Sequence, residues 1–592
     1  MSLENKNISF VYLLLVFFLS FLSLGYFFDF YSSLKLSMFS FLLMFVAHRE
    51  QLHYDSELYC KAIVNSVLLV IISIALLATF PNDFLPYFNA FPYESLEAGG
   101  KLHHDTLFHI ALIKSIMNFG YTSIGQDGNQ YIHYHYLSHY FDAGLSLILS
   151  LDPFEDYALI MSMKMIVLVA SVQLFLIRTI KERNLLIVLS LIISPAILYT
   201  WHVVGSHSLF YPSLFFILLS SKIFSVLVKE ECWSNVDYLV LTIVGLALVL
   251  AKVSSGFVFL SFIGVYSLST NFRNTKIYFW GSIWLLIIFF QWYMFRTFDS
   301  SAPSNLNSNF DASVLFSNAY SYLMVHNPIK ALLSPVDFIS GEELFFFKTQ
   351  TLIYCMLLCL LLFSALRQKI LMFKLSVSFF FVSLFIFSLS VLPLGLNVTD
   401  VFYFNSSLML LILVLLVQTV FYDIDEYNLF DKAMVLFGVS IVSLTSLFLL
   451  ERVGGSKSLD DLLILKNKSS AVETAQLKVL NKNLVALLEV KKLNASNTLL
   501  LVTKEAFESE LVHYNVEPWA RGLLIYSVTG VPLYHGITNL KNGYGYSRFT
   551  EENMSLRISE VNKKRLCYDT NKTFVIISSL YNDSFDILDC NT

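Results

Sequence analysis

The sequence predicts an all-α polytopic membrane protein with about 13 transmembrane helices, followed by a small α/β extracytoplasmic domain. Two observations lead to this fold class. Hydrophobic residues make up 56% of the 592 positions and charged residues only 14%, a composition typical of chains whose solvent is the lipid bilayer. Apolar runs of about 20 residues, which cross a hydrocarbon core of roughly 30 Å as helices, recur along the first three quarters of the chain.

Thirteen apolar runs are long enough, or nearly so, to cross the membrane, and they assign residues 1–450 to a transmembrane domain. The runs lie at 8–28, 30–47, 62–80, 157–177, 185–200, 209–228, 237–251, 254–269, 277–295, 350–366, 373–394, 401–421 and 433–450. No small-residue cleavage site follows the first run, so we expect a retained helix rather than a signal peptide.

Lysine and arginine in short connections predict the orientation, because cytoplasmic loops carry an excess of these residues. Four connections carry such clusters: Arg49 and Lys61; Arg178, Lys181 and Arg183; Arg273 and Lys276; and Arg367, Lys369 and Lys374. With the N-terminus in the cytoplasm, alternation places all four clusters on that side, and it places loops 81–156, 201–208 and 296–349 outside. A crossing at 137–151 would break this pattern, so we expect that segment to lie on the outer surface or to be re-entrant.

Residues 451–592 are predicted to form the second, extracytoplasmic α/β domain. Leucine, valine and alanine recur at helical spacing over 456–493. Three later runs are predicted to be short buried strands: Thr498–Val502, Leu523–Val528 and Thr573–Ser578. Cys567 and Cys590 are the only cysteines of this domain, and its compartment is expected to be oxidising, so we predict a disulfide between them.

The outer loop from 81 to 140 concentrates the residues that could carry chemistry. Six of the 13 histidines lie in its two motifs, His103-His104-Asp105-Thr106-Leu107-Phe108-His109 and His133-Tyr134-His135-Tyr136-Leu137-Ser138-His139. Asp105 and His109 are four residues apart, so both point the same way from a helix that ends near Gly120. We expect this helix to lie in the membrane interface. Imidazoles there can donate to phosphate oxygens, bind metal or shuttle protons, or can simply anchor the loop at the headgroups.

Further polar residues are expected on the same outer side. They are Trp201, His202 and His207 in one short turn, Lys252 between two apolar runs, and Arg296 at the end of a crossing. A cation between membrane segments usually lines a cavity or meets an anion. The alternative for Lys252 is a side chain that extends to the outer interface.

This arrangement resembles the GT-C superfamily of membrane glycosyltransferases. The resemblance rests on Asp105 followed by Phe108-His109 at the start of a helix in an outer loop, on Tyr134-His135-Tyr136, on the many-helix body and on the outer C-terminal domain. The segment Thr529-Gly530-Val531-Pro532-Leu533-Tyr534 also resembles a Thr-Gly-x-Pro-x-Tyr strand-turn-strand element of bacterial members.

The resemblance implies an inverting transferase that moves a sugar from a polyprenyl-phosphate carrier to an extracytoplasmic glycan, lipid or protein acceptor. It implies that Asp105 is the general base on the acceptor hydroxyl. The implied substrate-binding residues are His103, His104, His109, His133, Tyr134, His135, His202, His207, Lys252 and Arg296. The rival classes are a polymerase or ligase of lipid-linked glycans, and a membrane transporter.

The expected partners and cofactors follow from charge and spacing. A net charge of −5 makes nucleic acid a poor candidate partner; membrane lipids are expected, and we favour a bacterial inner membrane. No cofactor is predicted, because the loop lacks an Asp-x-Asp or Asp-Glu pair. A divalent metal such as zinc is the alternative, since His103, His104, Asp105 and His109 supply enough ligands.

Overall fold

The computed structural model describes part of the chain. The described residues are 35, 38, 63–67, 92–93, 102–125, 128–129, 131–132, 136–179, 207–228, 233–298, 370–391, 403–404, 407–408, 410–412, 414–415, 417–418, 490, 494–503, 521–534, 566–567, 572–579 and 584–590. The predicted crossings at 8–28, 185–200, 350–366 and 433–450 lie outside this part, as do most of those at 30–47 and 62–80 and nearly all of loop 296–349.

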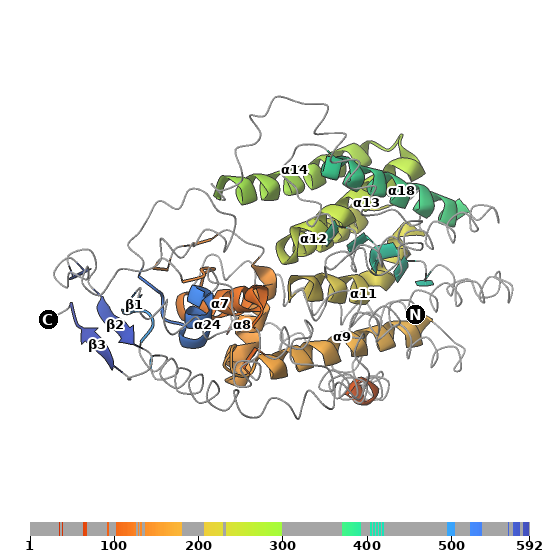
Figure 1. Cartoon of the computed structure of the whole chain (residues 1–592). Helices are drawn as coiled ribbons and strands as arrows, with labels where there is room; N and C mark the ends of the chain where they lie inside the picture. Colours follow the sequence, from red (N-terminus) through yellow and green to blue (C-terminus); the bar gives the residue numbers. More distant parts are fainter. Residues whose placement is uncertain are drawn as a thin grey trace, which may run out of the picture.

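Six predicted crossings coincide with helices of the structure. These helices are α9 (Tyr157–Thr179), α11 (His207–Leu227), α12 (Asn235–Ala251), α13 (Val253–Asn271), α14 (Thr275–Phe298) and α18 (Ile370–Val391), which Figure 1 draws as the larger helical part of the molecule. The described residues of the run at 401–421 are helical as well. Long apolar runs therefore predicted helix position well.

Two stretches, Tyr157–Leu176 and Val253–Thr270, are long and apolar enough to cross a membrane. Shorter apolar stretches lie at Leu209–Ser220, Asn235–Ala251, Thr275–Phe290 and Phe373–Ile386. A buried helix of a soluble protein can pass the same test of length and composition. The described residues thus define a mainly helical protein with a small sheet, and a membrane domain of 13 helices is not confirmed.

Helices α12 and α13 form a tight hairpin around a single residue. Asp237 and Ser234 make a capping box that starts α12, with the Ser234 hydroxyl oxygen accepting from the Asp237 backbone N–H at 3.2 Å. The chain turns at Lys252, whose extended backbone separates the two helices. A Cβ on Gly245 would lie 2.2 Å from a methyl carbon of Leu260, so this close packing requires glycine.

The loop between 81 and 156 contributes two shorter helices, α7 (His104–Phe119) and α8 (Leu137–Leu149). Helix α7 ends at Gly120 as predicted, because Gly120 adopts a left-handed conformation and its N–H donates to Ile116. Helix α8 has 13 residues and is about 20 Å long, too short for a bilayer core of roughly 30 Å. This length agrees with the expectation that 137–151 does not cross.

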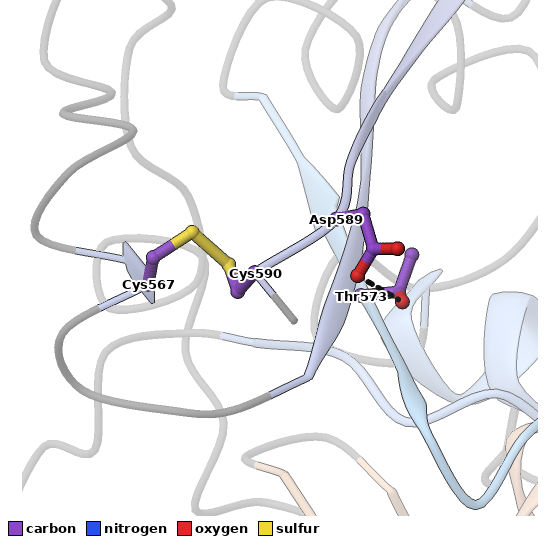
Figure 2. The surroundings of a disulfide bond; sticks show 4 residues. All are labelled: Cys567, Thr573, Asp589 and Cys590. Atoms are coloured by element: carbon purple, nitrogen blue, oxygen red, sulfur yellow. Dashed lines mark hydrogen bonds between the residues drawn. A yellow bond between two sulfur atoms is a disulfide. The ribbon is translucent and has the colours of Figure 1, made fainter. Parts of the chain in front are cut away.

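The small sheet contains β1 (Thr498–Val502), β2 (Thr573–Ser579) and β3 (Ser584–Leu588), in the order β1-β2-β3. Strand β1 pairs with β2 in parallel, and β3 pairs with β2 in the antiparallel sense. The predicted strands at 498–502 and 573–578 are therefore confirmed. The predicted disulfide between Cys567 and Cys590 is also present, with an S–S distance of 2.02 Å. Figure 2 shows it beside the Thr573 hydroxyl, which donates to Asp589 at 3.4 Å.

The predicted strand at Leu523–Val528 is wrong, because these residues belong to helix α24 (Arg521–Thr529). Every residue of α24 is buried, so its apolar run carries no periodicity that separates a helix from a strand. The segment after it also differs from the strand-turn-strand expectation. Gly530 turns the chain at a φ of 68°, and Leu533 then makes a single parallel bridge to Leu500 of β1.

Helix α24 and helix α7 share one hydrophobic core. Leu107 and Ile110 of α7, Leu524 of α24 and Leu500 of β1 are all fully buried in the same cluster. Figure 1 shows α24 beside α7, with the sheet adjoining them. The described part of the C-terminal region therefore shares this core with the outer loop, and it also has a smaller cluster of its own around Leu501 and Phe574.

Polar contacts join the same two regions. The Ser527 hydroxyl donates to the carbonyl of Leu107 at 2.8 Å. Lys114 donates to the carbonyl of Val528 at 2.7 Å and lies 3.1 Å from the Asp152 carboxylate. Helix α7 is consequently covered by protein from Thr106 to Ile116, so the expected helix lying in the membrane interface is wrong, while Asp105 in its first turn stays partly exposed. A helix that is apolar around most of its circumference is buried on every side when elements are available to cover it.

Candidate functional site

The site is built around Asp105, in the first turn of α7. A carboxylate at this position is favoured by the positive end of the helix dipole. Its side chain is 25% exposed, whereas that of His109, one turn further along, is 4% exposed. The Asp105 carboxylate lies 3.6 Å from Nε2 of His109, so the two groups form the i,i+4 pair that the sequence predicted. Asp105 thus lies at the accessible edge of the site and His109 lies behind it.

A second imidazole lies directly behind His109. Nδ1 of His109 is 2.8 Å from Nε2 of His139, and the two rings are stacked with centroids 5.1 Å apart. His139 belongs to α8 and is fully buried. Sequence reasoning placed His139 in a histidine-rich motif but did not include it in the candidate site. No spacing rule connects two residues that are 30 positions apart on different helices.

His103 and His104 complete the α7 end of the site. Their rings stack on each other with centroids 4.7 Å apart, and both residues are half-buried. His103 is the N-cap residue of α7, and its carbonyl accepts from the N–H of Leu107 at 3.2 Å. The start of α7 therefore places three histidines, His103, His104 and His109, close to Asp105.

Lys252 reaches the same region from the helical bundle. It is buried, and its ammonium lies 3.8 Å from the centroid of the Tyr403 ring. Helix α8 meets this turn too, because the Ser138 hydroxyl donates to the carbonyl of Ala251 at 3.3 Å. The sequence predicted that Lys252 and the loop share one side of the molecule, and the structure brings Lys252 within electrostatic reach of Asp105.

These neighbours keep Asp105 ionised. Burial by itself would raise the pKa of the Asp105 carboxyl, because it disfavours the charged form. The charge and hydrogen-bonding capacity of His109, followed by the charges of His103 and Lys252, outweigh that effect and lower the pKa well below its usual value. The carboxylate is thus a stable anion surrounded by groups that can hold positive charge.

A second polar network lies deeper in the bundle. Lys164 of α9 lies 3.1 Å from one oxygen of Asp142 on α8, and the Tyr211 hydroxyl of α11 donates to the other oxygen at 2.8 Å. All three residues are buried. Sequence reasoning missed this network, although a charged residue inside each of two apolar runs was a usable signal.

The other predicted site residues are not placed. His133, Tyr134, His135 and His202 lie outside the described residues. His207 starts α11 and Arg296 lies near the end of α14, but their side chains are not described.

Metal binding has no support in the described part of the chain. That part contains no group of three or more histidine, cysteine, aspartate or glutamate side chains arranged to hold a metal ion. Of the four residues considered as zinc ligands, His103 and His104 form the ring stack, and Asp105 and His109 form the ion pair.

Comparison with known proteins adds no assignment. The chain matches no protein-family model, no curated protein and no solved structure. Function therefore has to be argued from the site itself. An ionised, partly exposed carboxylate can accept a proton from a hydroxyl group, and the imidazoles beside it and the lysine within electrostatic reach can offset negative charge that develops nearby.

Proposed function

We propose that this protein is a membrane glycosyltransferase of the GT-C type, which moves a sugar from a polyprenyl-phosphate carrier to an extracytoplasmic acceptor with inversion. The observation that carries the proposal is the pairing of Asp105 with His109 at 3.6 Å, with Lys252 close enough to act on the carboxylate electrostatically. A base and phosphate-compatible cations at one partly exposed site are what this reaction needs.

Exposed apolar surfaces support a membrane location. On α14 and α18 the large apolar side chains that are between 43% and 68% exposed are Tyr278, Phe279, Leu285, Leu286, Phe289, Phe290, Phe373, Phe380, Phe381, Leu384 and Phe385. Apolar surfaces of this extent are rare on soluble monomers. Lipid chains are the cover we propose for them.

The predicted alternation of the crossings has support from contacts at both ends of the bundle. The ends of α11 and α13 that were assigned to the cytoplasm meet, since the Tyr266 hydroxyl donates to the carbonyl of Leu227 at 2.9 Å. At the opposite end, Lys252 contacts Tyr403, at the start of another predicted crossing, and Ala251 contacts the outer loop.

The proposed reaction is a single displacement. The acceptor oxygen attacks the anomeric carbon and transfers its proton to Asp105. The bond between that carbon and the phosphate oxygen breaks, and the lipid phosphate leaves with the electron pair. Because the lowered pKa makes Asp105 a weak base, it accepts the proton only as the new bond acidifies the hydroxyl. Lys252 and the imidazoles offset the charge on the departing phosphate.

One observation favours a rival class, a membrane transporter. The Asp142–Lys164 pair is buried between helices, and buried ionisable groups in membrane segments often mark ion or substrate pathways. A polymerase or ligase of lipid-linked glycans would share the Asp105 site and differ in its donor. Both rivals are outcomes of the following experiment.

The test is a mass profile of surface glycans and lipid-linked sugars from cells lacking the protein. The cells are complemented with the parent chain, with Asp105→Asn, or with Asp589→Asn as a control at an exposed carboxylate distant in sequence. We expect the parent and Asp589→Asn to restore a missing sugar, and Asp105→Asn, inserted at equal level, to lower its incorporation at least about 100-fold.

Other outcomes separate the alternatives. Full restoration by Asp105→Asn would remove Asp105 from the mechanism. Accumulation of a complete lipid-linked oligosaccharide would favour the polymerase or ligase. No change in any glycan would leave transport as the better hypothesis.

A further inference from the structure

We propose that His139 is a positioning residue of the Asp105 site, which holds His109 in the tautomer that directs Nε2–H toward the Asp105 carboxylate. This inference rests on the proposed function, because it assigns a further residue to the same site. It adds His139, a second histidine and one from a different helix, to the groups that support Asp105 as a general base.

The hydrogen-bonding capacity of the groups determines the tautomer. An ionised carboxylate only accepts hydrogen bonds, so Nε2 of His109 carries a proton when it faces Asp105 at 3.6 Å. A protonated His109 ring, which lowers the pKa of Asp105 by its charge, would donate from both nitrogens. The inference concerns the neutral ring, in which Nδ1 is an acceptor. Nδ1 of His109 and Nε2 of His139 are 2.8 Å apart, so one proton lies between them. Because Nδ1 of the neutral His109 ring is an acceptor, Nε2 of His139 is the donor. His139 therefore favours the tautomer in which His109 can stabilise the Asp105 anion.

The burial of the pair makes this control direct. His139 is fully buried and His109 nearly so, and the rings are stacked at an interplanar angle of 26°. A buried imidazole whose partner is removed loses a hydrogen bond that bulk water cannot replace. Replacing His139 by an apolar side chain therefore leaves the tautomer and the ring orientation of His109 less strictly determined.

The position of His139 is set by the deeper polar network. Asp142 lies three residues further along α8, on the same side of the helix. Lys164 and Tyr211 bind both of its carboxylate oxygens. Ser138, next to His139, donates to Ala251 of α12. Three helices of the bundle thus fix the part of α8 that presents His139.

The titratable groups around the imidazole pair are on several elements. On α7 and the α12–α13 turn they are Asp105, His103 and Lys252, of which His103 and Lys252 act electrostatically on Asp105. On α8 and α9 they are Asp142, Lys164 and Tyr157, the last of which interacts electrostatically with both Asp142 and Asp105. A pH profile of this site reports on all of these groups, so the variants below change only His139 and are compared with the parent.

The experiment uses the full chain in lipid nanodiscs with ¹⁵N-labelled histidine. His139→Phe keeps a stacked ring and removes the hydrogen bond, whereas His139→Gln keeps a donor that does not titrate. In the parent and in His139→Gln we expect the His109 resonances to report the Nε2–H tautomer. In His139→Phe we expect a mixture of both tautomers.

Activity provides the second measurement. For sugar transfer we expect His139→Phe to lower kcat about 10- to 100-fold with little change in KM, because misplacing a group at the reacting centre by about 1 Å can cost about 100-fold. His139→Gln should retain most of kcat. A loss that is the same in both variants would overturn the positioning role, and so would an unchanged His109 tautomer in His139→Phe.

Failure of this inference can be told from failure of the proposed function. If Asp105→Asn abolishes transfer and His139→Phe leaves kcat and the His109 tautomer unchanged, only the role of His139 is overturned. If the parent transfers no sugar but the His109 tautomer depends on His139, the proposed function fails and the positioning of His109 by His139 is supported.

Discussion

Asp105 combines partial exposure with a strongly stabilised charge. Its carboxylate is accessible from one side, and His109 and the more distant Lys252 compensate its charge from the others. This combination suits a group that must meet a substrate and also remain ionised. It also makes a prediction about stability, because a pKa shift between the folded and unfolded chain is a free-energy difference.

We expect the Asp105 charge to stabilise the fold at neutral pH. The pKa of this carboxyl is lower in the folded protein than the value of about 3.9 typical of unfolded chains. Its stabilising contribution is therefore complete above that value and is lost as the pH falls toward the lower folded pKa. The difference in Tm between the parent and Asp105→Asn, measured in one detergent, should therefore change as the pH falls below about 4. A difference that stays constant below about pH 4 would contradict the lowered pKa.

Helix α8 shows how a short element can connect two polar clusters. It is too short to cross a bilayer, and it presents His139 to the site and Asp142 to the buried network. The energetic consequences of the two clusters differ. The outer cluster keeps one member partly exposed, whereas the Asp142–Lys164 pair is completely enclosed.

We expect Asp142→Asn to destabilise the protein by roughly 3–5 kcal/mol, because it leaves the buried Lys164 ammonium without the carboxylate that faces it. The double variant Asp142→Asn/Lys164→Met removes both charges and should recover most of this loss. Chemical unfolding in detergent micelles measures both free energies. A double variant as unstable as the single one would mean that the ion pair itself stabilises the fold.

The junction between the outer loop and α24 can be tested with two glycines of similar conformation. Gly125 and Gly128 have φ values of 62° and 64°, so alanine costs about 1–2 kcal/mol at either position. At Gly125 the new Cβ would also lie 2.3 Å from the Tyr526 ring, whereas nothing lies within 4 Å at Gly128. We expect Gly125→Ala to cost roughly 1–3 kcal/mol more than Gly128→Ala in the free energy of unfolding. Equal losses would mean that Tyr526 does not pack there.

At the scale of the whole molecule, two parts meet at the candidate site. One is the apolar bundle with exposed aromatic faces, and the other is the compact unit formed by the outer loop, α24 and the sheet. Asp105 comes from the second part and Lys252 from the first. In the proposed function, a membrane-bound donor and an acceptor from the aqueous compartment would meet at this junction.

The proposed orientation predicts the labelling of introduced cysteines. Tyr131 in the outer loop and Lys276 between α13 and α14 are both exposed. In a chain whose other free cysteines are serine, a membrane-impermeant maleimide should label Tyr131→Cys in spheroplasts, and it should label Lys276→Cys only after permeabilisation. Labelling of both sites in intact spheroplasts would contradict the alternation, and labelling of Lys276→Cys alone would reverse it.

Part of the candidate site could be predicted from the sequence. The Asp105–His109 pair follows from helical spacing over four residues, and the approach of Lys252 follows from its placement between two apolar runs on the outer side. His139 and the Asp142–Lys164–Tyr211 network could not be predicted. Their contacts join residues 22 to 69 positions apart on different helices, and no local periodicity encodes such distances.

The sequence by itself determined the helices α9, α11 to α14 and α18, the strands β1 and β2, and the disulfide. Long apolar runs, β-rich runs with polar connectors, and two cysteines in one region are local signals that depend little on the rest of the chain. Only the tertiary structure decided that Leu523–Val528 is helical and that α24 is buried against α7. The physical reason is that full burial removes the amphipathic pattern that distinguishes a helix from a strand, so packing determines the choice.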